Sequence, residues 1–143
     1  MTQVNFYTGV SERLAYVCRL LRKAQQSGAQ IGVCGPVASL RRLDAALWTF
    51  EPAEFVPHLD LSAGAADPHL LAATPIVLLE YAVDLGHRDI LLNLGAEVPE
   101  GFEQFRRVLE VVSQDGEQVQ AGRRRFRRYE ELGLSINHHK VPA

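Results

Sequence analysis

The residues best suited to chemistry gather near the C-terminal end of the chain, where five arginines fall within six positions. They are Arg123, Arg124, Arg125, Arg127 and Arg128. With Lys140 and two glutamates included, residues 118–140 carry a net charge of +4, whereas the whole chain carries −2, so the remainder carries −6. A cationic segment on an acidic body indicates an anionic partner, such as nucleic acid or an acidic peptide. A solvated helix face explains the same run equally well.

On a helical wheel this segment separates an apolar arc from a cationic face. The arc facing the core is expected to hold Val119, Gly122, Phe126 and Tyr129. Arg123 and Arg127 lie together beyond one edge of the arc, and Arg124 and Arg128 continue the cationic face. Like charges four residues apart repel by roughly 0.2–0.5 kcal/mol per pair. We therefore expect these arginines to serve an anion, with Phe126 as an apolar contact beside them.

A second group of chemically capable residues lies in an irregular stretch in the middle of the chain. Its members are His58, Asp60, Asp67 and His69. Two imidazoles and two carboxylates could bind zinc or a non-haem metal. Polar loop residues that face water have the same spacing, and we favour that interpretation. We expect no metal and no cofactor.

Other catalytic signatures are missing from the sequence. The turns after the first two expected strands, residues 7–11 and 34–38, hold one glycine each, and the second contains Pro36. Neither is a dinucleotide or triphosphate loop, and no G-x-S-x-G elbow occurs. Cys18 falls on an apolar helix stripe and Cys34 ends an apolar strand, so both are expected to be core residues. The sequence thus predicts no active site.

One tryptophan is placed unusually. Leu40, Leu43 and Leu47 form one stripe of an expected helix, and Trp48 points about 80–140° away from it. Phe55 and Pro57 follow shortly after. Such a segment is typical of a protein–protein anchor. Intramolecular cover of the indole by the irregular stretch fits the sequence equally well.

The elements that must position these residues alternate between strands and helices. Strands are expected at residues 4–7, 31–34, 76–79, 90–94 and 109–112. Helices are expected from Ser11 to Gly28, after Pro36, from Phe102 to Arg107 and from Gly116 to Leu132, with residues 50–74 irregular. Strands that are apolar on both faces predict an α/β fold, with an open, mostly parallel sheet of about five strands and helices on both faces.

Length and composition limit the classes of protein to which the chain can belong. The chain has 143 residues, 47% hydrophobic and 22% charged, which suits a single globular domain spanning residues 1–143. No apolar run reaches the roughly 18 residues of a membrane span, and the first residues lack a signal peptide. Two cysteines make no disulfide framework, so a reducing cytoplasm is expected.

Several segments resemble one known family. The block Arg42-Leu43-Asp44-Ala45-Ala46-Leu47-Trp48, followed by Phe55-Val56-Pro57-His58, is similar to the signature of the chi subunit of bacterial DNA polymerase III. The opening Asn5-Phe6-Tyr7, the strand segment Arg88–Leu94 and the arginine-rich helix before Gly133–Asn137 also fit this family. The resemblance spans essentially the whole chain in the expected order.

The resemblance implies a non-catalytic adaptor with a Rossmann-like fold that has lost nucleotide binding. It implies that the chain holds the acidic C-terminal tail of single-stranded DNA-binding protein, which ends in Phe. Arg123 and Arg127 would meet the tail carboxylates, Phe126 and Val112 the terminal ring, while Arg124 and Arg128 add long-range attraction. A family lysine one turn before Arg123 is here Val119.

The resemblance also implies a second surface, made by Trp48, Phe55 and Pro57, for the psi subunit or for a repair helicase of the iron–sulfur type. The chain would then be a monomer or one half of a 1:1 heterodimer, joined to DNA and the nucleoid only through the replisome. Two alternatives stay open. One is a direct binder of single-stranded nucleic acid through the arginine-rich helix, and the other is a metal-dependent enzyme using the His58–His69 group.

Overall fold

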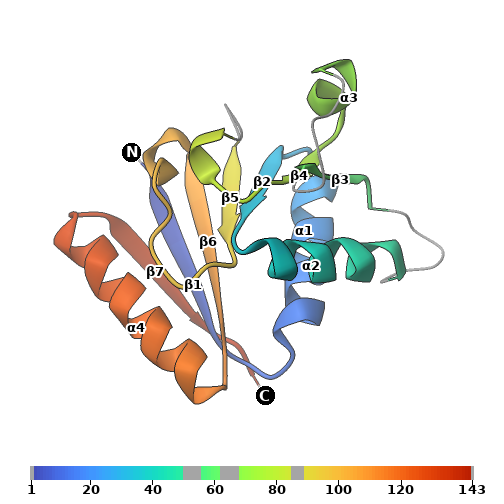
Figure 1. Cartoon of the computed structure of the whole chain (residues 1–143). Coiled ribbons are helices and arrows are strands. Elements are labelled where there is room, and N and C mark those ends of the chain that lie inside the picture. Colours follow the sequence, from blue (N-terminus) through green and yellow to red (C-terminus); the bar gives the residue numbers. More distant parts are fainter. Residues whose placement is uncertain (1, 50–55, 62–67, 85–88, 143) are drawn as a thin grey trace.

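One open sheet organises the chain. The computed structural model describes residues 2–49, 56–61, 68–84 and 89–142. The strands are β1 (Gln3–Val10), β2 (Ile31–Cys34), β3 (His58–Asp60), β4 (Ile76–Leu78), β5 (Ile90–Asn93), β6 (Arg107–Ser113) and β7 (Ser135–Lys140). They pair in the order β3-β4-β2-β5-β6-β1-β7, and every neighbouring pair is parallel (Figure 1).

Helices cover both faces of this sheet. They are α1 (Arg13–Gln26), α2 (Val37–Thr49), α3 (Pro68–Ala73) and α4 (Gly116–Glu131), with short 3-10 turns η2 (Ala82–Asp84) and η3 (Phe102–Gln104). Helices α1 and α2 pack on one face, and α4 packs against β6 and β7 on the other. Parallel strands buried on both faces require this arrangement, because each face must be shielded from water.

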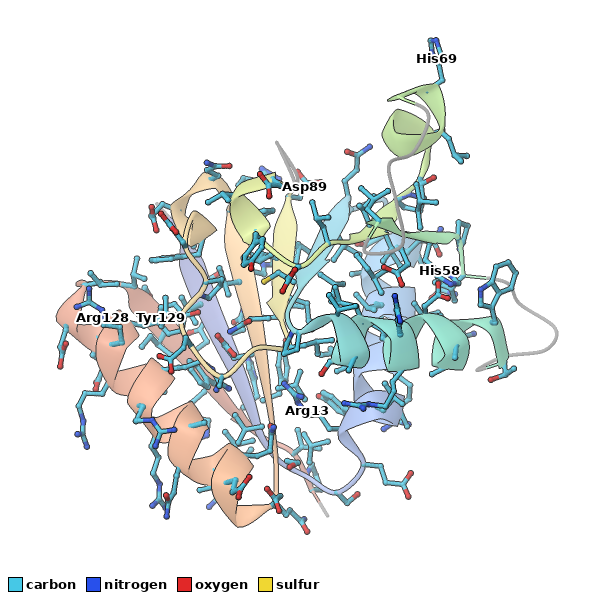
Figure 2. The ribbon with its side chains drawn as sticks, in the orientation of Figure 1. Arg13, His58, His69, Asp89, Arg128 and Tyr129 are labelled. Atoms are coloured by element: carbon cyan, nitrogen blue, oxygen red, sulfur yellow. The ribbon has the colours of Figure 1, made fainter. Side chains whose placement is uncertain are left out.

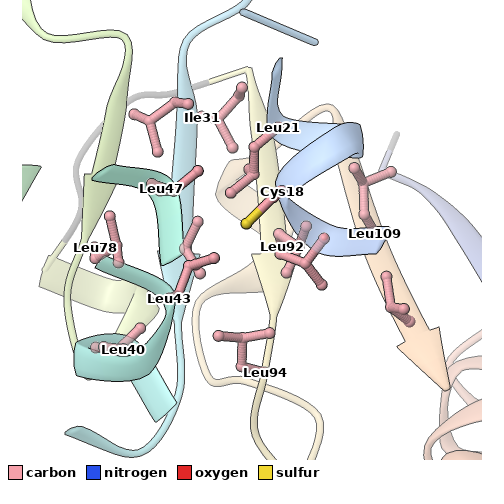
Figure 3. Close-up of a cluster of buried hydrophobic side chains, with 14 of the residues drawn as sticks. Cys18, Leu21, Ile31, Leu40, Leu43, Leu47, Leu78, Leu92, Leu94 and Leu109 are labelled. Carbon is pink, nitrogen blue, oxygen red and sulfur yellow. The ribbon is translucent and has the colours of Figure 1, made fainter. Parts of the chain in front are cut away.

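Two apolar layers hold the helices to the sheet. Cys18, Leu21 and Leu43 from α1 and α2 pack on Leu92 and its neighbours (Figure 3). Phe6 and Tyr129 lie in the second layer, beneath α4. Complete burial of each large side chain contributes about 1.5–3 kcal/mol. Apolar packing against α4 therefore stabilises the β6–β1–β7 half of the sheet.

The predicted α/β fold with a parallel sheet and helices on both faces is confirmed, but the expected number of strands is wrong. Strand β3 has only three half-buried residues, and β7 is polar and exposed at the sheet edge, so neither shows an apolar run. The stretch 50–74, expected to be irregular, contains β3 and α3. The helix expected from Phe102 is the turn η3, and Arg107 already belongs to β6.

Both thiols are buried, as the sequence predicts. Burial raises the pKa of Cys18 to about 11 and that of Cys34 to about 12. Reactive cysteines need a lowered pKa and an exposed, electropositive setting, so these two act as small core residues. Within the described ranges, none of the helices has the length and apolarity needed to cross a bilayer.

Candidate functional site

The core-facing arc of helix α4 is rotated from the predicted one, although Gly122 and Tyr129 are buried as predicted. Its buried residues are Ala121, Gly122, Arg125 and Tyr129, whereas Val119 and Phe126 are only half-buried. Asp115 caps the N-terminus of the helix, and its carboxylate accepts a hydrogen bond from the Gln118 amide at 3.3 Å. One of the five arginines thus lies in the interior and cannot belong to an exposed cationic face.

Arg125 is buried because β6 offers it a buried carboxyl group, Glu110. The Arg125 Nε donates to Glu110 Oε1 at 2.9 Å, and both side chains are almost fully inaccessible. The Tyr129 hydroxyl donates to Glu110 Oε2 at 2.7 Å, and the Asn93 amide donates to the same oxygen at 3.0 Å. Burial raises the pKa of Glu110, although these three partners favour its ionised form. A lone Glu inside an apolar strand was the sequence signal that could have revealed this cluster.

A glycine sets the distance between α4 and β6. A Cβ atom at Gly122 would lie 2.8 Å from Val112 Cγ2, which real side chains essentially never allow. The helix can therefore approach Val112 closely at this one position. On either side of Gly122, Val119 and Phe126 stand over the sheet.

The space between α4 and the strands β1, β6 and β7 is a groove of about 670 Å³, which we call the α4–β7 groove. Its apolar lining includes Phe6, Val112, Val119 and Phe126. The Phe126 ring lies 5.1 Å from the Phe6 ring and 6.1 Å from the imidazole of His138. His138 Nε2 lies 2.7 Å from Thr8 Oγ1 across the two strands. The floor is therefore an aromatic surface with polar groups at its β7 side.

Arg123 and Arg127 line the same groove, and both are exposed. Neither makes an ion pair with any carboxylate that the structure describes. Arg128 instead contacts Glu131 at 3.6 Å and lies on the outer side of α4, while Tyr129 faces the sheet (Figure 2). Of the residues predicted for this site, Arg123, Phe126, Arg127 and Val112 come together in the groove. Arg124 and Arg128 are exposed but do not line it.

The second predicted surface lies at the opposite end of the sheet. Trp48, at the end of α2, is 60% exposed. His58 packs edge-on against its indole at 5.3 Å, and His58 Nε2 lies 3.0 Å from Asp44 Oδ1. Pro57 is half-buried next to His58, and Phe55 lies outside the described residues. The tryptophan is thus in contact with His58 and yet largely exposed.

The two histidines among the candidate metal ligands do not come together. His58 is engaged with Asp44, whereas His69 projects from α3, well away from it (Figure 2). Asp67 lies outside the described part of the chain. Among the residues that the structure does describe, there is no group of three or more His, Cys, Asp or Glu side chains that could hold a metal ion.

Comparisons with known proteins agree on one family. Residues 1–137 match the family described as DNA polymerase III chi subunit, HolC. The chain is 36% identical to the DNA polymerase III subunit chi of Pseudomonas aeruginosa, with 99% of both chains covered. It is 29% identical to the subunit of that name in Haemophilus influenzae (87% of this chain, 84% of the relative) and 26% identical to that of Escherichia coli K12 (90% and 86%).

Proposed function

Because the chain belongs to the DNA polymerase III chi subunit family, we propose that it links the polymerase to single-stranded DNA through a protein contact made in the α4–β7 groove. Members of this family are non-catalytic accessory subunits of the replicative polymerase. The ligand of the groove is the acidic C-terminal tail of single-stranded DNA-binding protein, which ends in Phe. This protein is therefore an adaptor within the replisome.

The observation that carries the proposal is the placing of two unpaired cations beside an apolar floor. Arg123 and Arg127 lie one helical turn apart along one wall of the groove, where their guanidinium groups can form bidentate bonds with carboxylates. The terminal Phe of the tail would pack against Phe126 and Val112. A groove of about 670 Å³ has room for this ring and for the neighbouring residues of the peptide.

Val119 alters the balance between charge and apolar contact. Where the family has a lysine, this chain has a half-buried side chain that lines the groove. The site therefore has one cation fewer and a longer apolar wall. Arg124 and Arg128 lie outside the lining, so they attract the tail over distance without contacting it in the groove.

The disorder of the free tail sets the expected affinity of the groove for it. The peptide loses conformational entropy when it binds, so its affinity should be modest, with a Kd of about 1–10 μM. Exposed charge pairs weaken as salt rises, whereas burial of the terminal ring does not. Salt should therefore reduce the affinity of the tail without abolishing its dependence on the terminal Phe.

The exposed Trp48 supports a second contact. We propose that Trp48, with Phe55 and Pro57, docks the psi subunit or a repair helicase. A large aromatic side chain held from one side by His58 is the type of residue that dominates interface energies. Because this surface lies at the far end of the sheet from the α4–β7 groove, both partners can be bound together.

The test is fluorescence anisotropy with a labelled acidic peptide that ends in Asp-x-x-Phe, compared with the same peptide lacking the Phe. We expect micromolar binding of the intact peptide, at least 10-fold weaker binding of the shortened one, and loss of binding in Arg123→Glu/Arg127→Glu. Equal binding of the two peptides would contradict the proposal.

Direct binding of nucleic acid through α4 is the competing function, favoured only by the exposure of Arg124 and Arg128. It requires that Arg124→Glu weakens the binding of an oligonucleotide. Tail binding, in contrast, should hardly change in this variant, because Arg124 does not line the groove.

A further inference from the structure

Strands β1 and β7 have a second face, opposite α4, which is exposed along β7 and half-buried at Tyr7 of β1. Side chains alternate along each strand, so Phe6 and His138 point toward α4 whereas Tyr7 and His139 point to the other side. Helix α1 packs on this other side, over β6 and β2 (Figure 1). On β7, Asn137 and His139 stay exposed. The proposed tail contact uses none of these outward side chains.

Aromatic rings run across this face from the sheet edge to α1. Tyr7 and His139 face each other in register on adjacent strands, and their rings are stacked, with centroids 4.8 Å apart and planes 15° apart. Tyr16 of α1 lies 5.8 Å from Tyr7 on the inner side. We call these three rings the aromatic row. At its outer end, the exposed His139 belongs to the last strand of the sheet.

Cations border the aromatic row. The Arg19 guanidinium lies over the Tyr16 ring, 5.6 Å from its centroid. Lys23 follows one turn later on the same side of α1, and Arg107 of β6 is paired in register with Gln3 of β1. All three cationic residues are exposed.

Carboxylates are few around these cations. Helix α1 contains no acidic residue between Arg13 and Gln26. Asp89, near Arg107, accepts a hydrogen bond from the Gln30 amide at 3.0 Å and lies 3.9 Å from Arg106. The face is thus locally positive, although the chain as a whole is slightly acidic.

We propose that this face binds a single strand of nucleic acid. Bases stack on aromatic rings because both are flat π-systems, and cations beside the rings neutralise the phosphates. The exposed His139 ring, which is stacked on the half-buried Tyr7, supplies the stacking surface, and Arg19, Lys23 and Arg107 supply the charges. An acidic peptide with one aromatic residue could stack only once, whereas a single strand presents a base beside every phosphate. The bases of a duplex are already stacked on each other.

This site goes beyond the proposed adaptor function and is separate from it. The aromatic row and the α4–β7 groove lie on opposite faces of β1 and β7, so one can be altered without the other. A strand bound here would lie next to a tail bound in the groove. The chain would then contact the DNA itself as well as the protein that coats it.

The test is anisotropy of labelled 15-mers of dT and rU with the full chain, together with an abasic 15-mer of equal charge. At low salt we expect micromolar binding of the strands with bases and about 5- to 10-fold weaker binding of the abasic strand. The logarithm of the affinity should fall with that of the salt concentration with a slope of about −2, as three phosphate contacts predict. The tighter of dT and rU then identifies the natural ligand as DNA or RNA.

Two pairs of variants locate the site. Arg19→Glu should weaken dT binding about 5- to 10-fold, whereas Arg124→Glu, the same charge change on the exposed side of α4, should not. His139→Ala should weaken it similarly, and His139→Phe should restore it because a ring is again present. Tail-peptide binding should stay unchanged in Arg19→Glu and His139→Phe, which also shows that both variants are folded.

Three results would overturn the proposal. One is the absence of dT binding at about 100 μM protein in about 20 mM salt, because a site with a still lower affinity would not be useful. Another is equal binding of dT and the abasic strand, which would mean that charge alone explains the affinity. The third is an equal loss of dT binding in Arg19→Glu and Arg124→Glu. None of these results bears on whether the tail binds in the α4–β7 groove.

Discussion

The two ends of the sheet carry the two proposed binding surfaces, and these are built in opposite ways. At the β7 end, strands of 7, 8 and 6 residues lie under a 16-residue helix that is fixed by the buried Arg125–Glu110 pair. At the β3 end, β3 and β4 have three residues each, and the surface consists of one exposed indole supported by His58. The first surface is concave and the second projects outward.

This difference shows how each surface should obtain its affinity. A groove depends on the spacing between helix and strands, so its affinity is sensitive to the internal packing that holds α4 in place. A projecting aromatic residue instead depends on the pocket that its partner provides. Damage to the core should therefore affect tail binding first, and damage to Trp48 should affect only its own partner.

The largest effect should come from Arg125→Met, which leaves Glu110 buried without its cation. We expect a loss of about 3–5 kcal/mol in the free energy of unfolding, measured by urea denaturation. Arg124→Met is the matched control on the exposed side of the same helix and should change stability by less than about 0.5 kcal/mol. Equal stabilities of the two variants would show that the buried pair does not support α4.

Trp48→Ala should weaken docking of the second partner by at least about 2 kcal/mol, measured by calorimetry with the psi subunit or the helicase. Tail binding and the free energy of unfolding should hardly change, because the indole is 60% exposed. The neighbouring Leu47→Ala, which empties a core position, should instead lose about 2–5 kcal/mol of stability. A similar loss of stability in both variants would make Trp48 a structural residue.

Arg127→Ala should weaken tail binding by about 1–3 kcal/mol through loss of a charge-assisted contact. Its effect should shrink as salt is added, which anisotropy at two salt concentrations would reveal. Arg128→Ala is the control, since this side chain contacts Glu131 and lies outside the groove. If the control lost as much affinity, long-range attraction rather than contact would explain the role of these arginines.

Val119→Lys introduces the cation that the resemblance to the chi family implies at this position, and it should raise tail affinity by about 0.5 kcal/mol at low salt, as one exposed charge pair contributes. Val119→Leu keeps the apolar wall and should leave the salt dependence unchanged. An increase in affinity that persists at high salt would point to a contact other than charge.

The smallest effect on stability at neutral pH is expected from the buried groups Cys18, Cys34 and Tyr129, because they lose their protons only at alkaline pH. Burial raises the pKa of Cys34 to about 12 and of Cys18 to about 11, and it also raises that of Tyr129. Above about pH 9 the unfolded chain loses these protons while the folded chain keeps them, so stability should fall as pH rises from 9 toward 12. Urea denaturation across this range would test it; constant stability would contradict the burial of these groups.

Sequence patterns predicted the elements that have a clear apolar period. The parallel core follows from strands such as Ile90–Asn93, which are apolar on both faces, and the exposed Arg123 and Arg127 follow from the helical wheel. Strand β7 could not be predicted in the same way, because Ser135–Lys140 is polar and exposed and has no apolar period.

The burial of Arg125, which the helical wheel did not predict, has a physical cause. A wheel treats every arginine as exposed, since it contains no information about the partner that an adjacent strand provides. Glu110 makes burial of this one arginine favourable and rotates the core-facing arc toward Ala121 and Arg125. Val119 and Phe126 are thereby turned into the groove, where they are available to a ligand.

The position of β1 between β6 and β7 determines when the groove can exist during synthesis. The first strand to leave the ribosome has both of its partners near the end of the chain, with nearly a hundred residues between Val10 and Arg107. Translation at about 5–20 residues per second leaves β1 unpaired for roughly 5–20 s. Since β1, β6, β7 and α4 all line the groove, the proposed tail contact cannot form until β7 has been synthesised. A chain interrupted before that point leaves β1 with an unpaired edge.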